Sequence, residues 1–288
     1  MALGPPEAVD AVPAAPPRVG LIASARTGGA LRLPARWNNG FGYEPENYCG
    51  ANGVVDPCSG TKTFEPDNRD IVTVDPVVLW AGDACSTYAS ARDRQARARR
   101  RLEACQSKLL AGELWEGTQA QASSFDNKYL ASPDANTVSD TSLSPSDGLA
   151  CLEQALAACS CSRSMIHVTN GLMVYLARDN LVTRVGDVFV TANDTLVVAD
   201  AGYTGTGPEG QAATTGAVWA YGTDIVNVAL DEVQVFPKTD IEAMGQTDGL
   251  YDNSLTYRAE RLAAAWWDGC CHLAIPFDID VCSDLEAS

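Results

Sequence analysis

The chain contains two histidines, His167 and His272, and a catalytic site that uses histidine as its acid or base must include one of them. A serine or cysteine nucleophile needs a neighbouring base, and histidine is the usual one. Each histidine lies in an apolar, strand-like stretch, at residues 165–168 and 271–274. Buried histidines in such stretches usually satisfy their ring nitrogens with hydrogen bonds inside the protein. We therefore interpret both as structural residues and expect no enzymatic activity.

A glycine-rich segment, GTGPEG at residues 205–210, matches the G-x-G-x-x-G pattern of dinucleotide-binding proteins. In those proteins the last glycines open a helix whose N-terminus binds the pyrophosphate. Here Pro208 and Glu209 lead into further loop-like sequence, so that context is missing. We interpret the segment as a loop and expect no nucleotide cofactor, with a soluble enzyme that uses this loop as a remote alternative.

Ten cysteines are the third source of chemistry. The densest group, CCH at residues 270–272, places adjacent cysteines on opposite faces of a strand, and the chain contains no C-x2-C pair. This spacing argues against a zinc site, so we expect no metal. No basic and apolar export signal opens the sequence, which favours reduced thiols. A disulfide between Cys49 and Cys58 would require an oxidising environment.

The charge balance limits the partners. The 288 residues include 20 basic and 37 acidic side chains, a formal net charge of −17. Such a surface repels polyanions on average, which argues against a dedicated nucleic-acid reader or a protein that binds anionic membranes. No window approaches the ~20 apolar residues of a membrane span, so we expect no membrane partner.

One basic cluster departs from this balance, on a long helix expected at residues 84–116 with Asp83 or Ser86 as its N-cap and Gly117 as its end. The cluster consists of Arg92, Arg94, Arg97, Arg99, Arg100 and Arg101. These arginines point in several directions around the helix and do not form one groove-reading face. Ion pairing with acidic neighbours is the favoured interpretation, and contact with a polyanion stays open.

The remaining pattern predicts an α+β fold without regular β-α-β alternation. Residues 118–146, rich in Ser, Thr, Asp, Asn and Pro, are expected to form a loop or a boundary. Shorter helices are expected at residues 146–159, with Ser146 and Asp147 as the cap, and at 170–178, capped by Thr169 or Asn170. Strands or apolar segments are expected at 18–23, 71–80, 188–190, 195–199, 217–221, 225–230, 233–236, 255–265 and 271–277. The long excursion at residues 37–67 contains aromatic residues that must pack on the rest of the chain or on a neighbouring subunit.

Several strings, taken with the order of elements, resemble the major capsid proteins of tailed double-stranded-DNA bacteriophages. The strings are MIHVTNGL at 165–172, DTLVVADAGY at 194–203, WAYGT at 219–223 and SLTYRAERLAAA at 254–265. The last is similar to a near-terminal segment of many such proteins, particularly those of actinobacterial phages. Their fold, the Johnson fold first seen in the Hong Kong phage, is also used by encapsulins.

The resemblance implies a Hong Kong phage-type α+β capsid fold in five parts. These are an N-terminal arm at 1–40, an extended-loop region at 41–82, a peripheral domain with the spine helix at 83–147, an axial domain at 148–250 and C-terminal strands of the peripheral domain at 251–288. The family's N-terminal scaffolding segment is not visible, and Lys62 is the only lysine of the excursion. Neither proteolytic maturation nor a lysine cross-link is therefore expected.

By function, the resemblance implies a structural protein that self-assembles as hexamers and pentamers into an icosahedral head. The head would enclose double-stranded DNA and contact it non-specifically. It would assemble in the host cytoplasm and become part of the virion. Scaffolding, portal and decoration proteins are the further partners implied. An encapsulin-type compartment shell is the alternative.

Candidate intersubunit contacts are the basic cluster, one aromatic residue of the excursion and five residues near the C-terminus. Those six are Trp37, Arg258, Glu260, Arg261, Trp266 and Trp267. No catalytic, cofactor-binding or metal-binding residue is assigned.

Overall fold

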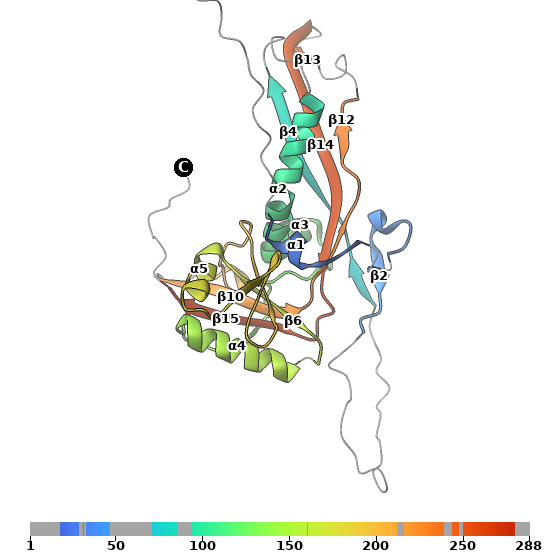
Figure 1. Cartoon of the computed structure of the whole chain (residues 1–288). Helices are drawn as coiled ribbons and strands as arrows, with labels where there is room; N and C mark the ends of the chain where they lie inside the picture. Colours follow the sequence, from blue (N-terminus) through green and yellow to red (C-terminus); the bar gives the residue numbers. More distant parts are fainter. Residues whose placement is uncertain are drawn as a thin grey trace, which may run out of the picture. The chain divides into compact units, whose positions relative to one another are not determined.

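The computed structural model describes residues 18–28, 31, 33–46, 71–85, 94–159, 161–211, 216–238, 244–247 and 250–279 (Figure 1). Their contacts divide the chain into two compact units. The smaller unit contains residues 78–106 and 230–262, and the larger unit contains residues 18–77, 107–229 and 263–279. Each unit thus combines segments that lie far apart in the sequence.

In the smaller unit, strands pair with the long strand β14 (Leu250–Trp266), which continues into the larger unit. Its partners are β4 (Val77–Cys85), β12 (Gln234–Phe236) and β13 (Met244–Thr247). The first half of α2 (Arg94–Glu116) belongs to the same unit. Alternate residues of the strands are buried, including Leu79, Tyr257 and Ala259, as expected for a sheet with one covered face.

The first residues of the stretch predicted as the long helix belong to a strand, and Ser86, the alternative N-cap, lies outside the described residues. Ala84 and Cys85 end strand β4, and the helix is described from Arg94. Asp83, expected as an N-cap, lies instead in β4 with its side chain buried. The predicted end is confirmed, because Gly117 follows the helix with φ of 62°, in the left-handed region where glycine is favoured. A Cβ at Gly117 would lie 2.4 Å from the Tyr129 ring, which also favours glycine.

In the larger unit, a seven-stranded sheet has the order β5-β15-β10-β6-β9-β8-β7. In chain order these strands are β5 (Asn136–Thr137), β6 (Ser164–Val168), β7 (Thr183–Val185), β8 (Val188–Val190), β9 (Leu196–Ala199), β10 (Ala217–Asp224) and β15 (His272–Asp278). Strand β10 is antiparallel to β15 and β6, and β6 is parallel to β9. Five of these strands match sequence expectations, whereas β5 and β7 were not predicted.

Two helices, α4 (Pro145–Cys159) and α5 (Asn170–Arg178), share the core of this sheet. Leu152 and Leu176 are fully buried with the strand residue Ile166. The predicted cap of α5 is confirmed, since the Thr169 hydroxyl accepts a hydrogen bond from the Leu172 amide. Helix α4 is capped by Ser144, not by the predicted residues, because Pro145 occupies its first turn.

The remaining elements of the larger unit are short. They are α1 (Leu21–Ser24), β1 (Arg26–Thr27), η2 (Trp37–Asn39), β2 (Phe41–Tyr43), β3 (Val72–Val74), α3 (Thr118–Ser123), η4 (Pro208–Gly210) and β11 (Asn227–Leu230). Strand β1 pairs in parallel with β11, and β2 pairs with β3 in antiparallel fashion. Residues 18–23 were predicted as a strand, whereas helix α1 begins within this stretch at Leu21. Helix α3 lies in a stretch predicted as a loop.

The expected domain limits separate residues 217–221 from 271–277, whereas β10 and β15 pair over seven residues. The sequence limits follow chain order, but a sheet brings together segments that are distant along the chain. The five-part division therefore stays a prediction about the assembled protein.

Candidate intersubunit surfaces

The basic cluster of α2 contacts the sheet of its own unit. Arg101 lies 2.8 Å from Asp83 Oδ1 and donates a second hydrogen bond to the Gly82 carbonyl at 2.8 Å. Arg97 reaches the same carboxylate at 3.6 Å. Because the Asp83 side chain is only 3% exposed, these cations compensate a buried negative charge. The ion-pair interpretation of the cluster is confirmed for Arg97 and Arg101.

The other arginines of the cluster differ in how exposed they are. Arg99 donates to the Val233 carbonyl at 3.3 Å, and Arg94 is buried. Arg100 is half-buried. Arg92 lies outside the described residues. The described cluster therefore holds α2 against the sheet, and its role between subunits stays a prediction.

Strand β14 directs its charged residues to opposite sides. Arg258 and Glu260 form an ion pair of 2.5 Å, and the Arg258 side chain is 56% exposed. Arg261 donates instead to the Asp231 carbonyl and to Gln106 of α2. Burial lowers the pKa of the Arg261 guanidinium. Arg258 and Glu260 thus remain accessible, whereas Arg261 is an internal contact.

The candidate tryptophans belong to the core of the larger unit. Trp266 meets Phe41 edge to face, with ring centroids 5.2 Å apart, and Trp37 packs on the same apolar cluster. Trp267 is fully buried beside the His272 ring, and Tyr43 donates to its carbonyl at 3.0 Å. The described aromatic residues of the excursion therefore pack on the rest of the chain.

His167 is completely buried and hydrogen-bonded through both ring nitrogens. Its Nε2 lies 3.0 Å from the Thr223 hydroxyl, which itself donates to the Asp224 carbonyl. Thr223 must accept from Nε2–H, so Nδ1 accepts from the Tyr203 hydroxyl at 2.8 Å. Burial, with a smaller contribution from His272, lowers the pKa of His167 to about 3. The neutral imidazole is a structural part of the core, as the sequence predicts.

His272 is also held in place. Its Nε2 donates to the Leu130 carbonyl at 2.9 Å, and burial lowers its pKa. The structural interpretation of both histidines is thus confirmed.

The glycine-rich segment is a loop fixed to the end of α2. Residues Pro208–Gly210 form a single 3-10 turn rather than the start of an α-helix, so the loop interpretation is confirmed. The indole nitrogen of Trp115 and the hydroxyl of Tyr221 both donate to the Thr206 carbonyl, at 3.2 and 2.9 Å. The Thr206 hydroxyl donates to the Glu116 carboxylate at 2.7 Å.

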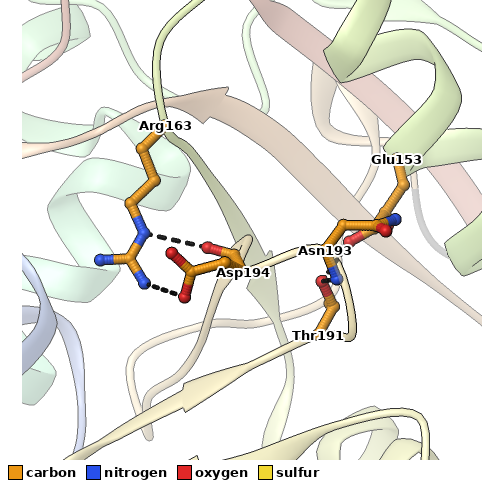
Figure 2. Close-up of polar contacts among 5 residues, drawn as sticks. All are labelled: Glu153, Arg163, Thr191, Asn193 and Asp194. Atoms are coloured by element: carbon orange, nitrogen blue, oxygen red, sulfur yellow. Dashed lines mark hydrogen bonds and ion pairs between the residues drawn. The ribbon is translucent and has the colours of Figure 1, made fainter.

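A polar network that sequence reasoning missed holds the turn between β8 and β9 (Figure 2). Glu153 of α4 accepts hydrogen bonds from the Thr191 hydroxyl and the Asn193 side-chain amide. Arg163 donates to Asp194 twice, to its carbonyl at 2.9 Å and its carboxylate at 2.7 Å. The Asn-Asp pair between two apolar runs is a turn signal, and Asp194 has φ of 63°. The residues that bind this turn, Arg163 and Glu153, lie 31 and 40 residues before Asp194 and Asn193 in the sequence. No local sequence signal therefore indicates these contacts.

The expectation of reduced thiols is wrong for three of the described cysteines. Cys159, at the end of α4, forms a disulfide with Cys271, at the start of β15. Packing of α4 on the sheet brings their Cα atoms to 5.8 Å, within the usual range for a disulfide. Cys270 is disulfide-bonded as well, whereas Cys105 and Cys151 are free and exposed. Cys49 and Cys58 lie outside the described residues.

Neither a metal site nor a membrane span is found in the described part of the chain. Its His, Cys, Asp and Glu side chains nowhere gather in a group of three or more that would hold a metal ion. None of its helices is both long and apolar enough to cross a bilayer.

Comparison with solved structures finds the same fold over nearly the whole chain. A capsid of an empty GTA particle, computed with C5 symmetry, has a TM-score of 0.57 and 11% identity, with 97% of this chain and 96% of that chain covered. A structure from Microbacterium phage Oxtober96 has a TM-score of 0.55 and 14% identity, with 96% of each chain covered.

The holo-SrpI encapsulin complex from Synechococcus elongatus is also similar, with a TM-score of 0.52, 11% identity, and coverage of 96% of this chain and 94% of that chain. No family model and no curated protein matches the sequence. The α+β capsid-type fold that the sequence predicts is confirmed.

Proposed function

We propose that this chain, which has the fold shared by phage capsids and encapsulin shells, is the major capsid protein of a tailed double-stranded-DNA phage. It forms hexamers and pentamers of an icosahedral head and has no enzymatic role. One observation carries the proposal: the likeness extends over 96% of both chains for the Microbacterium phage structure, and over 97% of this chain and 96% of that chain for the capsid of the empty GTA particle.

The charge distribution supports a DNA-containing shell with weak, non-specific contacts. The chain carries a net charge of −17, and Arg97 and Arg101 are already engaged by Asp83. An acidic lining repels the packaged DNA and leaves it free to move during packaging. The head forms in the host cytoplasm and becomes part of the virion, with scaffolding, portal and decoration proteins as further partners.

An encapsulin-type compartment shell is the second candidate, favoured by the likeness to the holo-SrpI complex. The two kinds of shell differ in what they contain, because a compartment shell holds a protein cargo and a phage head holds DNA. Absorbance at 260 and 280 nm of particles purified from the natural source distinguishes the two contents.

Self-assembly is tested on the full-length recombinant protein by mass photometry and negative-stain electron microscopy, alone and with a candidate scaffolding protein. Closed shells, or rings with fivefold and sixfold symmetry, are expected. A uniform monomer or dimer under every condition would overturn the proposal.

A further inference from the structure

The Cys159–Cys271 disulfide joins two residues that differ in accessibility. Cys159 is the last residue of α4 and is partly exposed, whereas Cys271 is completely buried. Helix ends fray, which adds to the access at Cys159. The backbone of Cys271 is fixed instead, since its amide donates to the buried Asp224 carboxylate at 3.2 Å. A reagent in solution therefore reaches the sulfur of Cys159 before that of Cys271.

Helix α4 is held on the sheet by more than this bond. Leu149, Leu152 and Leu156 of α4 are buried in the core that the helix shares with the sheet. A Cβ on Gly148 would lie 2.6 Å from the Phe277 ring, so α4 is in direct contact with β15. Burial of these leucines stabilises the contact whether the cysteines are reduced or oxidised. The chain can therefore fold before the disulfide forms.

A reduced Cys271 would also find a hydrogen-bond acceptor. Its Sγ lies 4.0 Å from the Leu156 carbonyl oxygen. This carbonyl is one of the last four of α4, and such carbonyls have no partner inside the helix. A thiol is a weak donor, so its S–H group can satisfy this oxygen. The contact also places the Cys271 sulfur against the last turn of α4, where Cys159 lies.

The compartment decides when the bond forms. Proteins made in the cytoplasm keep their thiols reduced, and disulfides persist in oxidising surroundings. On the proposed function the chain folds and assembles in the host cytoplasm and meets an oxidising environment only on release. The disulfide then has to close within a folded subunit, where one sulfur is accessible and the other is not.

We propose that Cys159 is a thiol–disulfide exchange site for small disulfides such as glutathione disulfide, and that Cys271 is the thiol that then displaces the small molecule. The exchange adds a covalent link between α4 and β15 after folding. The order of the two cysteines stands on their burial alone. Only the timing, after assembly, rests on the proposed function.

The reaction consists of two exchange steps. In the first, the Cys159 thiolate attacks one sulfur of glutathione disulfide, and one glutathione thiolate leaves and takes up the proton that Cys159 lost. In the second, the Cys271 thiolate attacks Cys159 Sγ, forms the Cys159–Cys271 bond and displaces the second glutathione, which takes up the proton from Cys271. The two protein thiols are thereby oxidised, and one glutathione disulfide is reduced to two glutathione molecules.

A time course on the wild-type chain tests the order without any substitution. The unassembled protein is reduced, freed of reductant, mixed with glutathione disulfide and quenched in acid at intervals. Tandem mass spectrometry locates the glutathione and the Cys159–Cys271 bond. We expect every glutathione adduct of this pair on Cys159 and none on Cys271. Glutathione on Cys271 while Cys159 is still a thiol would overturn the proposal.

Two variants separate the steps. Both include Cys161→Ala and Cys270→Ala, so that neither neighbouring cysteine in the sequence can replace Cys271. With Cys271→Ala the second step is impossible, and we expect glutathione to remain on Cys159. With Cys159→Ala the first step is impossible, and we expect Cys271 to react at least about tenfold more slowly than Cys159 does, because it is buried. Equal rates, or no adduct on Cys159, would contradict the proposal.

The same two variants in urea are the matched control, and circular dichroism verifies that both are folded without it. Urea removes the burial of Cys271, so the two thiols should then react at similar rates. A difference in urea as large as in the native protein would show that burial does not set the order, which would also contradict the proposal.

The timing is tested in the cells that produce the shells. They are lysed in urea with N-ethylmaleimide, which alkylates every free thiol. We expect both cysteines to be alkylated at this stage, and to be linked in purified shells exposed to glutathione disulfide. A Cys159–Cys271 disulfide already present in the cells would overturn the timing. If the chain never assembles, the proposed function fails, whereas the rates on the unassembled chain still decide the order of the two cysteines.

Discussion

Asp200 Oδ2 accepts a hydrogen bond of 3.0 Å from the amide of Leu21, a residue 179 positions earlier in the chain. The same oxygen accepts from the Ser107 hydroxyl at 2.6 Å, and Oδ1 accepts from the Gly202 amide at 3.1 Å. One buried carboxylate thus joins α1, α2 and the loop after β9 within the larger unit.

Asp200→Asn should destabilise the subunit. An asparagine keeps one acceptor but turns an NH2 group toward one set of buried donors, which leaves them unsatisfied. The expected loss is about 2–3 kcal/mol, measured by urea unfolding of the unassembled protein. Asp187→Asn, at an exposed surface position, is the control and should unfold like wild type. Equal midpoints for all three proteins would contradict this account of Asp200.

Reduction should lower the melting temperature. The Cys159–Cys271 disulfide closes a loop of 112 residues, and such a loop restricts the unfolded chain by about 4–5 kcal/mol in the chain-entropy model. The expected shift is on the order of 10 °C. It is measured by differential scanning calorimetry with and without a phosphine reductant. Cys151→Ala, which changes a free exposed cysteine, should melt like wild type.

In Cys159→Ala the same reductant should have a markedly smaller effect on melting. If that variant responds as strongly as wild type, this disulfide is not the source of the shift.

Stability should fall as the pH decreases below 6.5 because of His167. Its pKa is about 3 in the folded chain and about 6.5 when unfolded, so the unfolded state binds the extra proton in the window between these values. The stability contribution is complete above pH 6.5 and is lost as the pH falls toward 3. Between pH 6.5 and 5 the expected loss is roughly 2 kcal/mol.

His167→Gln tests this assignment. Glutamine retains a donor and an acceptor but does not titrate, so the variant should lose less stability between pH 6.5 and 5 than wild type does. Urea unfolding at several pH values measures the two slopes. His272 has a lowered pKa as well, so His272→Gln is the comparison that separates the two contributions. An unchanged slope in His167→Gln would exclude His167 as the source.

Arg101→Gln should weaken the attachment of α2 to its sheet. The substitution removes the 2.8 Å contact with the buried Asp83 carboxylate and leaves Arg97 at 3.6 Å as the remaining cation. The expected cost is about 1–3 kcal/mol, since a buried charge loses its nearest partner. A double-mutant cycle with Asp83→Asn measures the coupling between the two residues. Zero coupling would show that the pair does not stabilise the unit.

The sequence predicted the elements of the larger unit well where the signal was local. Thr169 before an apolar helix and the apolar run at β9 are local features, and both were placed correctly. The start of α2 was misplaced, because Ala84 and Cys85 suit a helix and a strand equally well. Pairing with β14 decides between them, and that partner lies more than 150 residues away in the sequence.

The candidate intersubunit contacts were also predicted only as far as local sequence signals allowed. Residue type alone did not distinguish Arg258, which is exposed, from Arg261, which binds the Asp231 carbonyl. Strand alternation would separate them once β14 is recognised as a strand. The Cys159–Cys271 disulfide had no sequence signal, since the packing of α4 against β15 alone brings the two cysteines together.

The central claim is that copies of this chain close into a shell, and cryo-electron microscopy of the assembled full-length protein tests it most directly. We expect closed particles with pentamers at the fivefold vertices and hexamers between them. A chain that remains a monomer or dimer at every concentration, and with every candidate scaffolding protein, would contradict the claim that copies close into a shell.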